Sequence, residues 1–101
     1  FNAFVTSYPD SAQVGSARYW HGETYLAQKK YHHALQEFDV VIRDFPRSDK
    51  APSALLKKAF AYRDLGQSGQ ACGALRDVTQ KYKGSREARL AQGELSRANC
   101  R

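Results

Sequence analysis

Three histidines are the side chains in this sequence best suited to metal binding or proton transfer. They are His21, His32 and His33, and none stands with cysteines or acids in a metal-ligand spacing such as His-Glu-x-x-His. His32 and His33 are adjacent, so on a helix they would point about 100° apart and could not readily share one ion. We therefore expect polar surface histidines and no bound metal.

Glycines and hydroxyl groups offer no catalytic pattern either. Gly66 and Gly69 are expected in a turn and Gly22 at a packing position, so the seven glycines do not form a loop that would cradle phosphate. Nothing beyond composition groups a serine with a histidine and an acid. We expect a protein that is not an enzyme, with no catalytic residue and no cofactor.

The charge balance is basic, with 16 Lys and Arg against 10 Asp and Glu and a formal net charge of +6. Such a balance suits nucleic acid or an acidic protein partner. The basic residues are mixed with acidic ones at helical spacing until near the end. There only Glu87 and Glu94 stand against six basic residues: Lys81, Lys83, Arg86, Arg89, Arg97 and Arg101. Specific phosphate binding would need clustered bases with stacking aromatic residues, so we expect a solvated basic face and no nucleic-acid partner.

Length and hydropathy favour one small domain. The 101 residues are 42% hydrophobic and 26% charged, which is enough for a modest core. No stretch approaches the roughly 18 apolar residues of a membrane-spanning helix, so we expect no direct membrane insertion. The opening residues 1–5 show an apolar pattern with no capping residue before it, as if a helix had been cut. We therefore expect a fragment, with any signal peptide, anchor or oligomerisation segment upstream.

An internal repeat of 37 residues determines the predicted fold. The segment Tyr8-Pro9-Asp10-Ser11 recurs at 45–48 and, in degraded form, at 82–85. Shifting the chain by this period aligns residues of similar size: Ala17 with Ala54 and Ala91, Gly22 with Ala59, Tyr25 with Tyr62, Ala34 with Ala71, Phe38 with Leu75, and Val41 with Val78. A fixed period of this length is typical of stacked helical repeats.

Each repeat is predicted to be an antiparallel helical hairpin, because its apolar residues recur at helical spacing. The expected helices span roughly 1–7, 12–28, 31–44, 50–65, 68–82 and 86–99. Serines 11, 48 and 85 are candidate N-caps, Pro52 fits a first turn, and Gly66 fits a left-handed helix end. We expect an all-α, right-handed stack forming one domain, 1–101: a truncated repeat's second helix at 1–9, repeats at 11–46 and 48–83, and a final helix at 85–101.

The repeat residues resemble the tetratricopeptide signature. Its small, aromatic and proline positions are matched by Gly22, Tyr25, Ala34, Phe38 and Pro46. Each repeat here has three residues more than the usual 34 or so. The resemblance covers nearly the whole chain. It implies a module that binds protein partners.

A narrower resemblance is to the C-terminal repeat domain of the Tol-Pal cell division coordinator family (CpoB, also called YbgF). Three segments carry it: Ala17-Arg18-Tyr19-Trp20-His21-Gly22-Glu23, Tyr31-His32-His33-Ala34 and the run 45–57 from Phe45 to Lys57. The resemblance implies a Gram-negative periplasmic protein that binds TolA and helps to coordinate outer-membrane constriction with septal peptidoglycan synthesis. A peptidoglycan synthase would be a further partner, and an upstream coiled coil would form homotrimers. Lys83 and His21 depart from the family, which usually has proline and leucine there.

Two other functions remain open at this point. The tetratricopeptide lipoprotein of the outer-membrane barrel assembly machinery also repeats aromatic-Pro-x-Ser junctions, although the run 50–56 favours the first family. A basic repeat domain that binds RNA is the alternative from another class. A salt titration against nucleic acid would separate it, because phosphate contacts weaken steeply with salt.

Cys72 and Cys100 are the only cysteines. The first is expected near the start of the fifth helix and the second near the end of the sixth, and antiparallel neighbours bring those ends to the same edge. A disulfide is therefore geometrically feasible and would be permitted in the periplasm. The alternative is two unpaired thiols, one in the core and one at a frayed terminus.

The candidate binding site is a concave face made by the first helix of each hairpin. One strip is predicted in each of two repeats: Ser16, Tyr19, Glu23 and Leu26, then Ser53, Leu56, Phe60 and Arg63. Tyr19 and Phe60 are the expected exposed anchors, and Glu23 and Arg63 the charges that would fix a partner's register. The alternative, kept open above all for Leu56 and Phe60, is that these side chains pack against one another. Trp20 is expected to pack rather than to contact a partner.

Overall fold

A computed structural model of the chain describes residues 11–98 and residue 100. These residues form five helices: α2 (Ser11–Ala27), α3 (Tyr31–Asp44), α4 (Ala51–Asp64), α5 (Ser68–Lys81) and α6 (Arg86–Arg97). No strand occurs within the described part of the chain, and each of the five helices ends within two residues of its predicted bounds. The all-α prediction is confirmed. The predicted helix at 1–7 lies outside the described residues.

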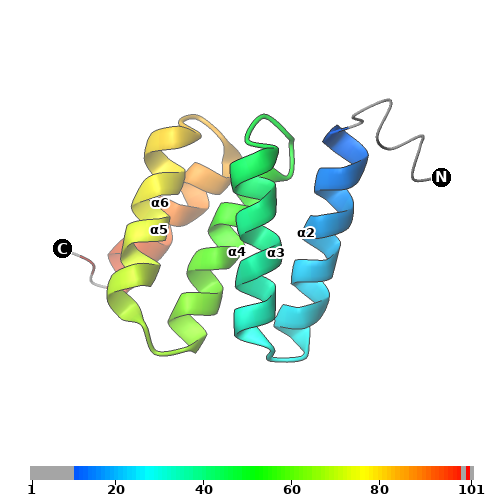
Figure 1. Ribbon diagram of the computed structural model, residues 1–101. Coiled ribbons are helices and arrows are strands. Elements are labelled where there is room, and N and C mark those ends of the chain that lie inside the picture. Colours follow the sequence, from blue (N-terminus) through cyan, green and yellow to red (C-terminus); the bar gives the residue numbers. More distant parts are fainter. Residues whose placement is uncertain (1–10, 99, 101) are drawn as a thin grey trace.

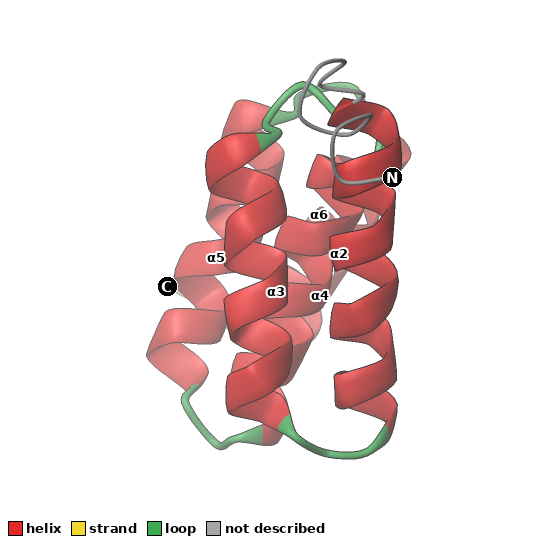
Figure 2. Ribbon diagram, turned by 45° about the vertical axis from the view of Figure 1, so that its right-hand side comes forward, coloured by secondary structure: helices red, strands yellow, loops and turns green. Residues whose placement is uncertain are grey.

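The helices form two layers of a flat array that measures 47 × 30 × 16 Å. Successive helices run antiparallel, as Figure 1 shows, so α2 with α3 and α4 with α5 make two hairpins and α6 begins a third. The first helices of these units, α2, α4 and α6, contact one another in sequence order and make one layer, while α3 and α5 make the other (Figure 2). The predicted stacking of hairpins is confirmed.

Matched residue sizes hold each hairpin together. Phe38 of α3 is fully buried against α2, where Gly22 leaves room for its ring. In the second hairpin the corresponding pair is Ala59 and Leu75, both buried in one cluster, so a larger first-helix residue faces a smaller second-helix residue. The volume across the crossing is thereby kept nearly constant, as close-packed interiors require.

Gly22→Ala is expected to destabilise the protein by about 1 to 3 kcal/mol, because an added Cβ would lie 2.5 Å from Cε1 of the buried Phe38 ring. Gly73→Ala is the matched control, since Gly73 lies inside α5 with nothing within 4 Å of the added Cβ. That change should stabilise by about 0.5 to 1 kcal/mol through helix propensity. Urea denaturation followed by circular dichroism measures the free energy of unfolding of both variants. Changes of the same sign in the two variants would show that α2 and α3 are not tightly packed at Gly22.

The helix ends agree only partly with prediction. Gly66 ends α4 with φ of +79°, and Lys29 takes the same repeat position after α2 with φ of +63°. Ser85 is the N-cap of α6 and accepts a hydrogen bond from the Ala88 amide at 3.0 Å. Ser48 is not an N-cap, and Ser11 is the first residue of α2.

Ser48 instead stabilises a turn that precedes α4. Its hydroxyl accepts from the Lys50 amide at 3.1 Å, two residues on, and its carbonyl accepts from Ala51. The chain therefore turns once more before α4 begins. Pro52 then falls in the first turn of α4, where its missing N–H leaves no hydrogen bond unmade.

Candidate protein-binding groove

The three first helices together line a groove of about 420 Å³. Helix α2 contributes one side chain, and α4 and α6 contribute four each: Tyr19; Ser53, Leu56, Lys57 and Phe60; and Arg86, Glu87, Leu90 and Glu94. We call this set the groove. Its lining mixes apolar side chains with both signs of charge.

Four of the eight predicted site residues line the groove: Tyr19, Ser53, Leu56 and Phe60. Two more lie at its edge through ion pairs, Glu23 with Lys57 at 3.5 Å and Arg63 with Glu94 at 3.8 Å. Ser16 and Leu26 share α2 but do not line it, and Leu26 packs against the core. Binding by any of them stays a prediction.

The predicted exposure of the anchor Tyr19 is wrong, whereas Leu56 packs inward, as the alternative kept open for it allowed. Tyr19 and Leu56 are only 6% and 5% exposed, so they form the floor of the groove. Trp20, which we expected to pack, is 54% exposed, although its edge contacts the Tyr19 ring with centroids 5.1 Å apart. Tyr19 and Trp20 therefore exchange the roles that the sequence suggested.

The buried face of α2 contains Tyr19 and leaves Trp20 outside it. Among residues 14–27 of that helix the buried ones are Gly15, Tyr19 and Gly22, and Ala17, which the repeat aligns with Ala54 and Ala91, is exposed. Ala54, the repeat equivalent of Ala17, is buried because it packs against the preceding hairpin. Ala17 belongs to the first described hairpin, and it is exposed.

The contribution of α6 was missed, although the repeat contained the signal. Applying the 37-residue shift twice takes Ser16 to Ser53 and then to Leu90, which is 49% exposed in the groove. The same operation takes Trp20 to Lys57 and then to Glu94, both of which line the groove. Trp20 thus holds on α2 the position that faces the groove on α4 and α6.

Tyr19 is held in the floor by a hydrogen bond that its hydroxyl donates to Glu23 at 3.1 Å. Burial of the hydroxyl, with the negative charge of Glu23 next in importance, raises the pKa of Tyr19 to about 12. The neutral phenol is therefore the form that the folded protein favours. Burial raises the pKa of Tyr82 as well.

Stability is expected to fall as the pH rises from 10 towards 12. The unfolded chain ionises Tyr19 near its ordinary pKa of about 10 and the folded chain only near 12, so the contribution is complete below pH 10 and is lost across this window. Urea midpoints measured along this pH series should fall less steeply for Tyr19→Phe, which keeps Tyr82. Parallel pH dependence in the two proteins would contradict the assignment.

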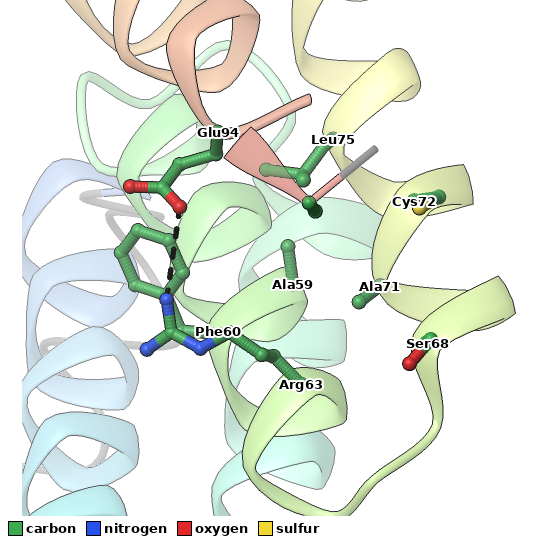
Figure 3. A pocket seen from close by; sticks show the side chains of 9 residues that line it. Ala59, Phe60, Arg63, Ser68, Ala71, Cys72, Leu75 and Glu94 are labelled. Carbon is green, nitrogen blue, oxygen red and sulfur yellow. Dashed lines mark ion pairs between the residues drawn. The ribbon is translucent and has the colours of Figure 1, made fainter. Parts of the chain in front are cut away.

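A smaller hollow of about 60 Å³ lies beside the groove, between α4, α5 and α6 (Figure 3). Its wall is mainly apolar and is formed by Ala59, Phe60, Ala71, Cys72, Leu75 and Ala98, with Ser68. The Arg63–Glu94 ion pair lies along one side of it, as Figure 3 shows. Phe60 and Glu94 line both spaces. We call this space the side hollow.

Cys72 and Cys100 form a disulfide in the structure, with their Cα atoms 5.7 Å apart. The bond joins the second turn of α5 to the segment after α6. It therefore holds the end of α6 beside the side hollow, which Cys72 lines.

Two further observations concern the described residues alone. No three or more His, Cys, Asp or Glu side chains gather there in a way that could hold a metal ion. None of the described helices combines the length and the apolar character needed to cross a bilayer.

Stacked helical hairpins with a common period and a groove lined by their first helices define a helical-repeat module for binding proteins. A family model for the tetratricopeptide repeat matches residues 16–48 and 53–85, which is more than half of the chain. The chain belongs to the tetratricopeptide repeat family. The two matches begin 37 residues apart, in agreement with the period read from the sequence. Comparison with curated proteins finds no match.

Proposed function

We propose that this chain is a non-catalytic module that binds a segment of a partner protein in its groove. One observation carries the proposal: the large hydrophobic residues exposed within the described part of the chain, Trp20 and Leu90, both lie on first helices. Leu90 lines the groove beside the partly buried Phe60. Apolar side chains grouped on one surface and surrounded by charges are a mark of an interaction site.

The partner that the sequence favours is TolA, and the compartment is the Gram-negative periplasm. The resemblance of residues 17–23, 31–34 and 45–57 to the Tol-Pal coordinator family supports both. The Cys72–Cys100 disulfide also supports the periplasm, because such bonds persist in oxidising compartments. In this role the module would help to coordinate outer-membrane constriction with septal peptidoglycan synthesis, with a peptidoglycan synthase on another surface.

Phe60→Ala and Leu90→Ala are each expected to weaken binding to the periplasmic part of TolA by about 1 to 3 kcal/mol. Both side chains line the groove and neither is fully buried, so their loss removes contact area without emptying the core. Isothermal titration calorimetry measures the change, with circular dichroism to check the fold. Tyr19→Ala is a poorer test, because Tyr19 is buried and its loss would also destabilise the protein.

Tyr31→Ala is the matched control, since Tyr31 is a partly buried aromatic residue at the start of α3, in the other layer. It should leave the affinity unchanged. If Phe60→Ala and Leu90→Ala stay folded and bind as tightly as the parent, the groove is not the site. If none of the proteins binds TolA, the partner is wrong.

A further inference from the structure

We infer that the partner segment is acidic and that it places one aliphatic side chain in the side hollow between α4, α5 and α6. This inference rests on the proposed function, since the segment must first lie in the groove. It adds the chemistry by which the segment would be recognised and the residue that would anchor it.

The size and lining of the side hollow indicate the anchor. An apolar cavity of about 150 Å³ holds a benzene ring in another protein, whereas the side hollow measures about 60 Å³. It is therefore too small for an aromatic ring and fits the end of an aliphatic chain. Four of its nine lining residues have aliphatic side chains that offer no hydrogen bond to a polar anchor: Ala59, Ala71, Leu75 and Ala98.

The side hollow is continuous with the groove. Phe60 and Glu94 line both spaces, and the guanidinium of Arg63 lies over the Phe60 ring, 4.7 Å from its centroid. The Arg63–Glu94 pair is long, at 3.8 Å, and the Arg63 side chain is 54% exposed. Figure 3 shows this pair lying beside the apolar side chains of the wall. A small movement of one exposed arginine side chain would admit an anchor from a segment lying along α4 and α6.

The charges along the groove favour an acidic segment. Each carboxylate already has donors within the chain: Glu23 has the Tyr19 hydroxyl and Lys57, Glu87 has the Ser53 hydroxyl and Arg86, and Glu94 has Arg97 and Arg63. These three carboxylate side chains are only 15–26% exposed, and Asp64, which also pairs with Arg63 at 3.4 Å, is 39% exposed. The four cationic side chains are 32–76% exposed.

The more exposed charges that a partner meets are therefore mostly positive. The arginines keep further N–H donors free for a carboxylate, because a guanidinium carries five and each ion pair here uses one or two. The net charge of +6 would also speed the approach of an acidic segment.

Selection of dodecapeptides displayed on phage against the full chain tests the inference. Enriched peptides are expected to carry net negative charge and a shared Leu, Ile, Val or Met. Synthetic fluorescent copies are then titrated by fluorescence polarisation. Ala98→Leu, which fills the hollow from an exposed position after α6, should weaken binding at least tenfold. Arg97→Glu should do the same and reduce the salt dependence of binding.

Two control variants make the same changes elsewhere. Ala27→Leu lies at the exposed end of α2, and Arg43→Glu lies on α3, where Arg43 is 70% exposed like Arg97. Both should bind within twofold of the parent. Peptides that bind the Leu90→Ala variant more weakly, but bind the Ala98→Leu and Arg97→Glu variants as tightly as the parent, would overturn the inference and leave the groove as the site. Peptides indifferent to Leu90→Ala as well, or no enrichment at all, would overturn the groove too.

Discussion

Phe38→Ala is expected to lower the free energy of unfolding by about 3 to 5 kcal/mol. The Phe38 ring is fully buried between α2 and α3, where it packs against Gly22 and against Tyr19 with ring centroids 5.9 Å apart. Truncation leaves a cavity that a glycine-lined helix cannot fill, because Gly22 has no side chain to move into it. Urea denaturation followed by circular dichroism measures the loss.

A double variant separates this packing argument from a general loss of hydrophobic surface. Gly22→Ala combined with Phe38→Leu reproduces the Ala59–Leu75 pair of the second hairpin. Adding Gly22→Ala to Phe38→Leu should therefore be neutral or stabilising, although the same change destabilises the parent. Such coupling is expected between residues in contact. Additive effects would mean that the two positions do not share one packing space.

Loss of the disulfide is expected to lower the free energy of unfolding by about 3 to 4 kcal/mol, in the chain-entropy account of a loop with a sequence separation of 28. Helix α6 is expected to depend on this bond more than the other helices do, because its buried residues are two small alanines, Ala88 and Ala91. The double variant Cys72→Ser/Cys100→Ser compared with the parent measures the effect. Amide hydrogen exchange should show the greatest loss of protection in α6.

Thiol titration provides the check on this prediction. The unreduced, denatured protein should show no free thiol, and the reduced parent should unfold at the same urea concentration as the double variant. Two free thiols in the unreduced protein, or equal midpoints before and after reduction, would contradict the bond or its contribution.

The repeat period accounts for most of the fold that could be predicted. Residue size at Gly22, Phe38, Ala34 and Ala71 reports packing at helix crossings, and the structure buries all four. Gly66 also ends its helix in the left-handed conformation, as predicted. These features are local or repeat themselves, so a single sequence contains enough information to locate them.

The candidate site was less predictable because exposure depends on neighbours distant in the sequence. Helix α2 carries apolar residues around much of its circumference, so its buried stripe could be read as containing Ala17 or Tyr19. Only the position of the adjacent helices decides between them. The cap expected at Ser48 failed for a local reason, because Ser48 bonds the Lys50 and Ala51 amides in an extra turn and α4 begins only at Ala51.

Mapping of contacts at residue resolution shows whether the groove of α2, α4 and α6 binds the partner. Amide and indole signals of the ¹⁵N-labelled full chain are followed while the periplasmic part of TolA is added. The account predicts that the largest shifts fall at Trp20, Phe60 and Leu90, with little change along the outward face of α3 and α5. Shifts concentrated on α3 and α5 instead would contradict it.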